Sequence, residues 1–265
     1  MMKFCKYHGA GNDFLLYDAR EDGTVFTPEQ VASLCDRHLG IGSDGLMTLS
    51  RADGYDFRME FFNPDGSGGM MCGNGGRCIA AFAKDLGIAP GADGSYHFLA
   101  PDGPHTAFLL SDDGPVKTVR LGMKPVTEFY PARDGWFIDT GTRHFVTFVP
   151  AVASVDVEHL GSTIRHLPEF GPVGVNVNFV ERTGPEEIAV RTFEKGVEGE
   201  TLACGTGITA SAIATYLSAV PAPGRHEILV HARRHDLSVA FTPCAGHFED
   251  VTLTGPAEKV ATILL

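Results

Sequence analysis

Apolar and polar residues alternate along much of the chain, and this pattern predicts a protein built mainly from short strands. Residues 55–61 read Tyr-Asp-Phe-Arg-Met-Glu-Phe and lead into the turn sequence Asn63-Pro64-Asp65-Gly66. Shorter alternating or β-branched runs follow at 116–121, 145–149, 175–180, 187–193, 227–230, 237–241 and 251–254. The 32 Gly and 16 Pro residues supply the tight turns that such strands need.

Two amphipathic helices are predicted between these strands. The first begins with Thr27 as its N-cap, Pro28 in its first turn and Gln30 as the capping-box partner. Its apolar stripe is expected to include Val31, Leu34, Cys35, His38 and Leu39, and Gly40 is expected to end it. A weaker helix is expected over residues 156–166, with Val157, Leu160 and Ile164 on one face.

Two further helices are predicted to begin at closely similar sequences. Cys72-Gly73-Asn74-Gly75 opens the segment 73–87, and Cys204-Gly205-Thr206-Gly207 opens the segment 205–216. Both segments are rich in Ala and small residues and carry few charges, so both helices are expected to be buried on most sides. The repeated pattern predicts two related halves, residues 1–114 with 254–265 and residues 115–253, with the seam in the Gly/Pro-rich stretch 102–115.

The composition is that of an acidic globular protein. The 21 Lys+Arg and 33 Asp+Glu residues give a formal net charge of −12, which disfavours nucleic acid and anionic membranes as partners. The N-terminus shows no signal peptide, and the longest apolar-rich stretch, 208–220, is too short to span a bilayer. In such a chain the six cysteines are expected to stay reduced, which predicts a cytoplasmic protein.

The two Cys-Gly turns are the strongest candidates for a reactive site in the sequence. The first amides of a helix lack partners within it and, with the helix dipole, favour a thiolate or a bound carboxylate. One such turn could serve a nucleophile or a redox thiol. Two of them suit the inversion of a carbon beside a carboxylate, where one thiolate removes the α-proton and the other thiol delivers a new one. This reaction needs no metal or organic cofactor in principle.

Seven motifs together resemble the diaminopimelate epimerases. They are His8-Gly9-Ala10-Gly11-Asn12-Asp13-Phe14, Arg37-His38-Leu39-Gly40-Ile41-Gly42, Phe62-Asn63-Pro64-Asp65-Gly66-Ser67, Cys72-Gly73-Asn74-Gly75, Asn176-Val177-Asn178-Phe179, Glu194-Lys195-Gly196 and Glu200-Thr201-Leu202-Ala203-Cys204-Gly205-Thr206-Gly207. They follow in family order, and Thr254-Gly255-Pro256-Ala257 matches the family's ending. The resemblance covers most of the chain, and the combination is far more specific than any single motif.

The resemblance implies a fold, a reaction and a set of site residues. The fold would be α/β (α+β), with two pseudo-symmetric domains, each a curved, barrel-like sheet around a central helix, and the active site in the cleft between them. The reaction would interconvert LL- and meso-diaminopimelate for lysine and peptidoglycan synthesis, without cofactor, in a homodimer. In the LL-to-meso direction Cys204 would accept the proton and Cys72 would donate one. The other implied residues are His144 and Glu194 near the thiols, the backbone of Gly73, Asn74, Gly205 and Thr206 at the reacting carboxylate, and Asn12, Asn63, Asn176, Glu194 and Lys195 at other polar groups of the substrate.

Several positions depart from the family's usual pattern. Gly45 stands where many members carry Gln, Gly68 where Glu is usual, and Thr142-Arg143 where Asn-Pro is more frequent. Lys195 stands where an Arg commonly pairs with the distal carboxylate, so a point charge replaces a bidentate fork. We hypothesise that Arg143 compensates at that carboxylate.

Other functions remain open on the sequence alone. The departures would fit a racemase of the same family acting on another amino acid. A Cys-dependent hydrolase or a thiol-redox protein would need only part of the arrangement, and a binding protein that lost catalysis would need neither thiol. The triplet His226, His231 and His235 is expected to be a solvated surface rather than a metal site, and no nucleotide-binding glycine motif is present.

Overall fold

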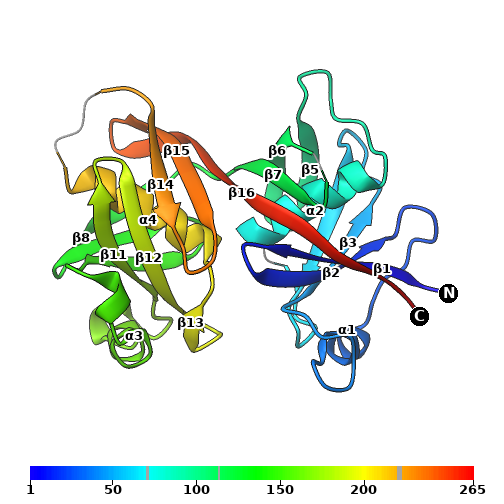
Figure 1. Ribbon diagram of the computed structural model, residues 1–265, viewed down its shortest axis with the longest axis horizontal. Coiled ribbons are helices and arrows are strands. Elements are labelled where there is room, and N and C mark those ends of the chain that lie inside the picture. The colour runs from blue at the N-terminus through cyan, green and yellow to red at the C-terminus, as the bar shows by residue number, and fades with distance from the viewer. Residues whose placement is uncertain (70–71, 113, 220–222) are drawn as a thin grey trace. The chain divides into compact units, whose positions relative to one another are not determined.

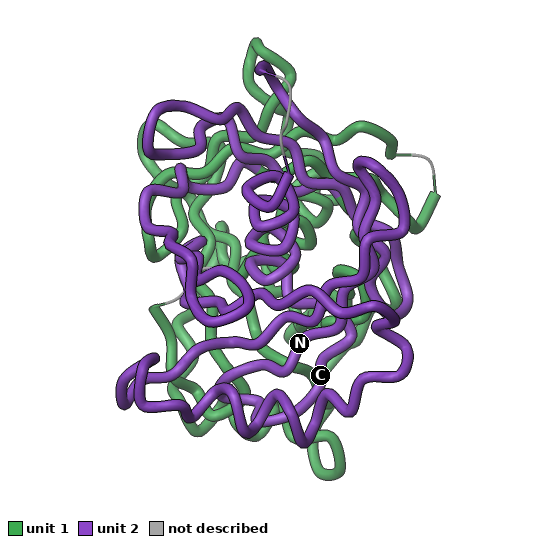
Figure 2. The backbone as a smooth tube through the Cα atoms, turned by 90° about the vertical axis from the view of Figure 1, so that its left-hand side faces the viewer, with its two compact units in different colours: residues 1–121, 255–265 green, residues 122–254 purple. Residues whose placement is uncertain are grey.

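A computed structural model describes residues 1–69, 72–112, 114–219 and 223–265 (Figure 1). The chain forms two compact units, one of Met1–Leu121 with Gly255–Leu265 and one of Gly122–Thr254 (Figure 2). They are called unit 1 and unit 2 below. Strand β16 (His247–Leu264) contributes its first part to unit 2 and its last part to unit 1. Unit 1 is therefore discontinuous in sequence.

Unit 1 is a closed sheet around one helix. Its strands are β1 (Lys3–Gly9), β2 (Asn12–Asp18), β3 (Leu46–Ser50), β4 (Phe57–Phe62), β5 (Tyr96–Ala100), β6 (Gly103–Ser111) and β7 (Val116–Gly122). They are hydrogen-bonded in chain order, and the end of β16 closes the ring by pairing with both β7 and β1. Helix α2 (Gly73–Asp85) contacts β1, β2, β3 and β6 and is buried along residues 73–83, as predicted.

Unit 2 repeats this plan. Its strands are β8 (Glu128–Ala132), β9 (Gly135–Asp139), β10 (Arg143–Phe148), β11 (Asn176–Gly184), β12 (Glu187–Glu194), β13 (Gly199–Thr201), β14 (His226–His231), β15 (Asp236–Cys244) and the start of β16. Helix α4 (Gly205–Leu217) lies at the centre of the unit with these strands around it (Figure 2). The parallel pairs β10–β11 and β12–β14 correspond to β2–β3 and β4–β5 of unit 1. The predicted pseudo-symmetry of the fold is confirmed.

An outer helix packs on each sheet. In unit 1, Val31 and Cys35 of α1 (Pro28–Cys35) join a core cluster with Phe4, Leu15 and Leu46. In unit 2, α3 (Val157–Arg165) and the short 3₁₀ helices η1 (Val152–Ser154) and η2 (Pro168–Phe170) contribute to the corresponding cluster. Strands such as β2 and β3 therefore bury side chains on both faces.

Helix α1 confirms the predicted start but not the predicted end. Thr27 and Gln30 form both hydrogen bonds of the capping box. The helix stops at Cys35 rather than continuing to Gly40, because the Asp36 carboxylate accepts hydrogen bonds from the amides of His38 and Leu39, each at 2.7 Å. This local turn competes with the next helical turn. Leu39 is consequently 91% exposed instead of belonging to the apolar stripe.

The predicted seam falls inside unit 1. Of the stretch 102–115, whose residue 113 lies outside the described residues, 103–111 form β6, paired with β5 and β7. The units change instead at Leu121/Gly122 and again at Thr254/Gly255. The run 251–254 belongs to a much longer strand, β16. Among the described residues, no helix is long and apolar enough to cross a membrane.

Candidate active site

Cys72 and Cys204 occupy the same structural position in the two units. Each is the N-cap of the central helix and has an extended backbone, with φ −112° and ψ 121° at Cys72 and φ −102° and ψ 107° at Cys204. The first intrahelical bonds are donated by Gly76 to the Cys72 carbonyl at 2.7 Å and by Ile208 to the Cys204 carbonyl at 2.8 Å. The amides of residues 73–75 and 205–207 precede these bonds, so they can serve a carboxylate.

Two predicted asparagines lie beside Cys72. The Asn12 Oδ1 atom is 3.7 Å from the Cys72 sulfur and 3.2 Å from Nδ2 of Asn74. The other end of the Asn12 amide donates to Asp44 at 2.7 Å. Asp44 is in turn 2.6 Å from Arg37. Asn12, Cys72 and Asn74 therefore form one hydrogen-bonded group, and Asp44 holds the Asn12 amide in place.

Arg77 is a member of this group that sequence reasoning missed. Its side chain is fully buried in the first turns of α2. It donates to Asn74 Oδ1 at 2.8 Å and to the carbonyls of Gly73 at 3.5 Å and Pro256 at 3.4 Å. Burial lowers the pKa of Arg77 from its usual value. The guanidinium thereby fixes the helix start that carries Cys72.

Asn63 and Gly45 occupy different environments from the Cys72 group. Asn63 lies in the turn after β4. Its side-chain Nδ2 donates to Ser67 Oγ at 3.0 Å, and its backbone N–H donates to the Ser67 carbonyl at 2.7 Å. A Cβ atom at Gly45 would lie 2.7 Å from the Phe62 carbonyl. The backbone here leaves no room for the Gln that many relatives carry at this position.

In unit 2, a half-buried hydrogen-bond network joins His144 to the turn that holds Cys204. The His144 Nε2 atom is 3.0 Å from Thr206 Oγ1 and 2.9 Å from Thr142 Oγ1. Thr142 donates to Thr206 at 3.0 Å, and Thr206 Oγ1 is 3.5 Å from the Cys204 sulfur. Thr142, one of the departures from the family pattern, is therefore part of the network around the thiol.

The other side of His144 is held by Asn178, which sequence reasoning did not single out. Asn178 Nδ2 is 3.1 Å from His144 Nδ1 and 3.1 Å from the Phe145 carbonyl, and Thr192 donates to Asn178 Oδ1 at 2.9 Å. His144 is completely buried, and this burial, with a smaller contribution from the charge of Lys195, lowers its pKa to about 3. The imidazole is neutral at physiological pH.

The Asn176 side chain forms hydrogen bonds with the main chains of Arg143 and Lys195, two of the predicted cationic residues. Its Nδ2 donates to the Arg143 carbonyl at 3.1 Å, and its Oδ1 accepts from the Lys195 amide at 2.8 Å. The Arg143 guanidinium lies over the Phe137 ring, 5.2 Å from its centroid. Glu194 is the last residue of β12, directly before Lys195. One side chain, that of Asn176, therefore holds the main chains of both Arg143 and Lys195.

Comparison with known proteins decides the family. A family model described as diaminopimelate epimerase matches residues 4–124 and 136–260. The chain belongs to the diaminopimelate epimerase family. A diaminopimelate epimerase from Flavobacterium psychrophilum is 40% identical over 262 residues, covering 98% of each chain. One from Chlorobaculum tepidum is 40% identical over 260 residues, covering 95% of this chain and 96% of the relative.

The fold extends beyond the diaminopimelate epimerase family. A phenazine biosynthesis protein of the PhzF family from Bacillus anthracis matches with a TM-score of 0.77 at 14% identity, covering 100% of this chain and 99% of that one. At this identity the match speaks for the fold alone. This match confirms the predicted two-domain α+β architecture. The family assignment by itself confirms that the chain is an isomerase of the epimerase type.

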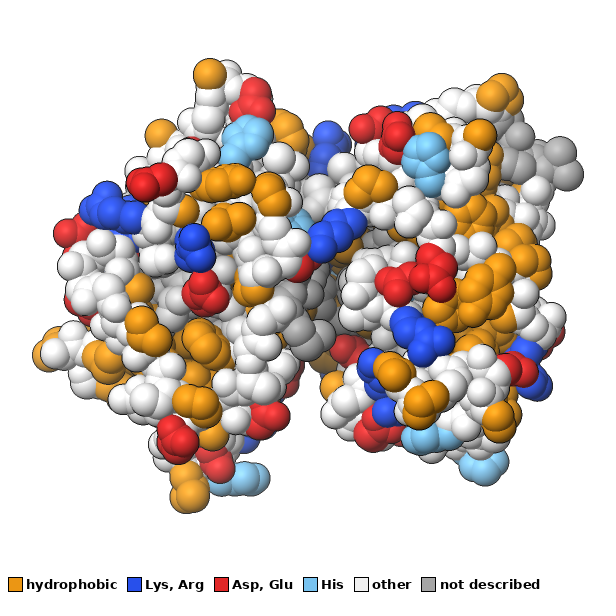
Figure 3. Space-filling view, turned by 180° about the vertical axis from the view of Figure 1, so that it is seen from behind, with side chains coloured by type: hydrophobic (Ala, Val, Ile, Leu, Met, Phe, Trp, Pro, Cys, Tyr) orange, Lys and Arg blue, Asp and Glu red, His pale blue; other side chains and the backbone are white. Residues whose placement is uncertain are grey.

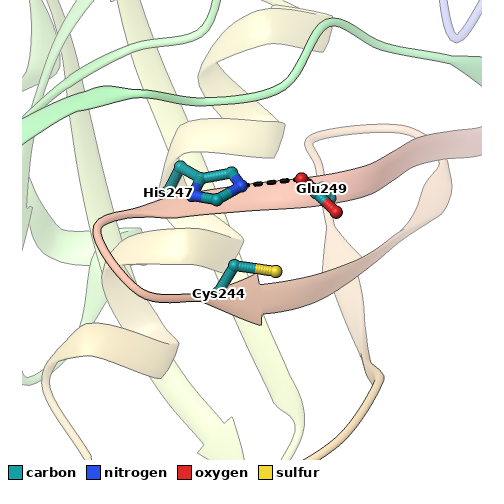
Figure 4. Close-up of side chains that lie close together, drawn as sticks. All are labelled: Cys244, His247 and Glu249. Atoms are coloured by element: carbon teal, nitrogen blue, oxygen red, sulfur yellow. Dashed lines mark hydrogen bonds and ion pairs between the residues drawn. The ribbon is translucent and has the colours of Figure 1, made fainter.

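Two clusters of potential metal ligands lie in unit 2 outside the site. In the described part of the chain, Cys244, His247 and Glu249 are the one group whose ligand atoms all lie within 4.8 Å of one another, on the β15–β16 hairpin (Figure 4). His247 Nε2 is 2.7 Å from Glu249 and is hydrogen-bonded to it, which accounts for their proximity. His231, expected to be solvated, meets Asp236 and Glu187 through opposite ring nitrogens, so these carboxylates do not converge with it on one ion.

Replacement of Gly207 by Ala is expected to destabilise unit 2 and slow turnover. A Cβ atom there would lie 2.3 Å from Asn178 Oδ1 and 3.3 Å from His144 Cε1. Because Asn178 is fully buried, the clash would outweigh the helix propensity of Ala and cost about 1–3 kcal/mol. Urea unfolding followed by the fluorescence of Trp136, which lies in unit 2, would measure this loss.

Gly75→Ala is the matched control, because Gly75 is the corresponding position of α2. There the added Cβ would meet Met47 Sδ at 3.0 Å, and a flexible Met side chain can move away. A Gly207→Ala protein as stable and active as Gly75→Ala would contradict the prediction.

Proposed function

We propose that this chain interconverts LL- and meso-2,6-diaminopimelate by exchanging the α-proton of one stereocentre between two cysteine thiols, without an organic cofactor or metal. The observation that carries the proposal is the duplicated helix start, with Cys72 and Cys204 as N-caps of the twin central helices. The substrate follows from the names of relatives that are 40% identical over nearly the whole chain. The product is a precursor for lysine and peptidoglycan synthesis.

The proton transfer requires one thiolate and one thiol. In the LL-to-meso direction the Cys204 thiolate takes the α-proton, and the Cys72 thiol gives its proton to the opposite face of the same carbon. The pair of electrons left by the first C–H bond forms the second one, so Cys204 ends as a thiol and Cys72 as a thiolate. Positioned acid and base groups of this kind contribute about 10²–10⁴-fold each to a rate.

The backbone amides at the two helix starts are proposed to hold the reacting carboxylate. Those of Gly73, Asn74, Gly205 and Thr206 precede the intrahelical hydrogen bonds, so their donors and the helix dipoles would face negative charge as it develops on the carboxylate. Removal of an α-proton without an electron sink depends on such fixed dipoles in a site that excludes water.

The remaining proposed contacts serve the amino groups and the distal end of the substrate. Asn12, Asn63, Asn176 and Glu194 offer the polar groups, and Lys195 with Arg143 offers positive charge to the distal carboxylate. The support for Arg143 is that Asn176 holds its main chain and that of Lys195. A lysine point charge together with an arginine fork would replace the single arginine that is common in the family.

Two alternatives make different predictions. A racemase of another amino acid would use the same thiols but a different distal pocket, at Gly45, Thr142, Arg143 and Lys195. A Cys-dependent hydrolase or thiol-redox protein would depend on the two cysteines unequally. The half-buried network behind Cys204 serves a proton-transfer thiol at least as well as a nucleophile, and the family assignment favours the first use.

The wider setting is also a proposal. We infer a cytoplasmic homodimer that acts on a small amino acid and binds neither nucleic acid nor membrane. Acidic and basic side chains are interspersed on the face of each unit seen in Figure 3, and the net charge is −12. Light scattering of the eluting protein would give the mass to compare with the chain's 28.4 kDa.

The decisive experiment follows the α-proton of LL-diaminopimelate by NMR in D₂O, with reduced protein, a chelator and no added cofactor. Loss of the signal together with appearance of the meso isomer would establish reaction and substrate. If free thiols are verified and no exchange occurs, the substrate assignment is wrong, and the same assay across other amino acids would find the racemase alternative.

A further inference from the structure

The two catalytic sulfurs contact groups of opposite hydrogen-bonding character. An amide oxygen, Asn12 Oδ1, faces Cys72 at 3.7 Å. A hydroxyl group, Thr206 Oγ1, faces Cys204 at 3.5 Å. A carbonyl oxygen can only accept a hydrogen bond, whereas a hydroxyl can donate one. Whether each sulfur meets an acceptor or a donor therefore depends on how the neighbouring amides and the imidazole are oriented.

In unit 1, two charged groups fix that orientation independently. The Asp44 carboxylate can only accept, so the Asn12 atom 2.7 Å from it must be the Nδ2 donor. The Arg77 guanidinium can only donate, so the Asn74 atom 2.8 Å from it must be Oδ1, which leaves Asn74 Nδ2 to donate to Asn12 Oδ1. Both constraints place the Asn12 oxygen against Cys72. That contact is a hydrogen bond only when the sulfur carries a proton.

In unit 2, a backbone carbonyl fixes the orientation of the Asn178 amide, and the resulting hydrogen bonds direct a donor towards Cys204. The carbonyl of Phe145 can only accept, so the Asn178 atom 3.1 Å from it is Nδ2, and Thr192 donates to the other end of the amide. The same Nδ2 meets His144 Nδ1, which must accept. The neutral imidazole then carries its proton on Nε2.

From His144, a chain of hydrogen bonds leads through Thr142 and Thr206 to the Cys204 sulfur. The Nε2 hydrogen can be given to Thr142 or Thr206, and Thr142 donates to Thr206 at 3.0 Å. With its oxygen accepting, the Thr206 hydroxyl has its own hydrogen available for Cys204. Chains of this kind polarise one another. The contact at Cys204 is therefore strongest when the sulfur is a thiolate.

We propose that the free enzyme rests with Cys204 as the thiolate and Cys72 as the thiol, and that Asp44 and Arg77 in unit 1 and Asn178 in unit 2 are positioning residues that set this asymmetry. His144 then acts as a neutral hydrogen-bond donor behind Thr206 and not as a base towards Cys204. The role of the asymmetry in turnover rests on the proposed function, since it prepares the acid and the base that the LL isomer requires. The protonation states themselves do not depend on the substrate.

Other charges also act near the thiols. Both cysteines cap a helix of 13 residues, so the helix dipole acts on both of them. Arg77, fully buried on α2, interacts electrostatically with Cys72 itself, whereas Lys195 after β12 acts on His144. Cys78, also on α2, is fully buried, and burial raises its pKa, so it stays neutral. Because the charge of Arg77 favours a thiolate at Cys72, the proposed resting state requires that the hydrogen-bond directions at the two sulfurs outweigh this charge.

The test measures the alkylation of each cysteine in the substrate-free protein as a function of pH. Brief treatment with iodoacetamide from about pH 5 to about pH 10, followed by peptide mass spectrometry, reports the thiolate fraction of each residue. Cys204 is expected to reach half its maximal rate at a pH lower by about one to two units than Cys72. Equal midpoints, or the reverse order, would overturn the proposal, even in a protein that epimerises diaminopimelate normally.

Substitutions in unit 2 separate the hydroxyl from general effects on the helix. Thr206→Val is expected to raise the midpoint of Cys204 by about one to two pH units, and Thr206→Ser to restore it. Thr209→Val is the matched control, since the Thr209 hydroxyl lies one turn further along α4, is fully buried, and donates to the Gly205 carbonyl at 3.0 Å. A shift of similar size in Thr209→Val would show that the effect is structural and would refute the role of Thr206.

In unit 1 the expected shift has the opposite sign. Asn12→Ala removes the acceptor that favours the protonated sulfur, so the alkylation midpoint of Cys72 is expected to fall while that of Cys204 stays unchanged. A rise or no change at Cys72 would contradict the proposal. The tautomer of His144 is tested directly by ¹⁵N NMR, where Nε2 and not Nδ1 should show the one-bond coupling to hydrogen at neutral pH.

Discussion

Replacing either Cys72 or Cys204 by Ala is expected to lower kcat for epimerisation by about 10²–10⁴-fold or more, by similar factors in both reaction directions. Each variant loses the acid or the base that one face of the substrate carbon requires. Alanine keeps the helix start, because neither cysteine caps its helix through a side-chain hydrogen bond. Chiral analysis of the product and circular dichroism of the variants would measure turnover and folding separately.

Proton exchange in these variants carries more information than the loss of turnover. With Cys72 removed, Cys204 can still take the α-proton of the LL isomer, so slow uptake of deuterium without inversion is expected in D₂O. Cys244→Ala is the control, since that thiol is exposed on the β15–β16 hairpin and has no proposed role. If one of the two variants kept its full epimerisation rate, the two-thiol mechanism would be refuted, and a single-cysteine reaction would take its place.

Sequence patterns predicted the fold where the signal is local. The capping box of Thr27 and Gln30 and the two Cys-Gly helix starts can be recognised within a few residues, and all three are present. Strands β2 and β3 escaped detection because they bury consecutive residues against the central helix on one face and α1 on the other. Such strands lose the alternation that identifies a half-exposed strand.

In the candidate site, too, the sequence predicted what depends on local motifs and missed what depends on strand pairing. The family motifs contain Asn12, Cys72 and Cys204, but they do not explain how these side chains are oriented. Asp44 meets Asn12 only because β2 and β3 run parallel and side by side, and Asn178 meets His144 through the parallel pair β10–β11. The role of Arg77 could not be recognised either, since arginine side chains are ordinarily exposed even on helices that are otherwise buried. Partners brought together by strand pairing leave no local pattern in the sequence.

Unit 2 is expected to lose stability on mild acidification because of His144. Burial lowers its pKa to about 3, from 6.5 for an unperturbed histidine. Between these two values the unfolded chain binds a proton that the folded one does not, so the free energy of unfolding falls as the pH falls. The full contribution is about 5 kcal/mol, of which about 2 kcal/mol is lost between pH 6.5 and about pH 5.

Between about pH 5 and pH 6.5, the effect of His144 on the free energy of unfolding can be separated from that of the other titrating groups. The carboxylates with lowered pKa, such as Asp13 and Asp18, already have a pKa of 3.8 in the unfolded chain, so their contributions to stability are lost at lower pH. His231 and His247 have raised pKa values because carboxylates accept their hydrogen bonds. Their stabilisation is fully present below the unfolded pKa and is lost only as the pH rises through the folded value. Above about pH 5, His144 is therefore the group that makes stability fall with acid.

The fluorescence of Trp136 makes the effect measurable in unit 2 alone. This residue is the one Trp of the chain, and it pairs with Val146 on the strand that carries His144. Urea unfolding curves at several pH values should give the predicted slope, and His144→Gln should flatten it, because glutamine does not titrate. If the variant is too unstable for unfolding curves, the His144 ring signals of the native protein provide a second test. Protonation of the ring near pH 6.5 in the folded state would show that His144 is not held neutral by its surroundings.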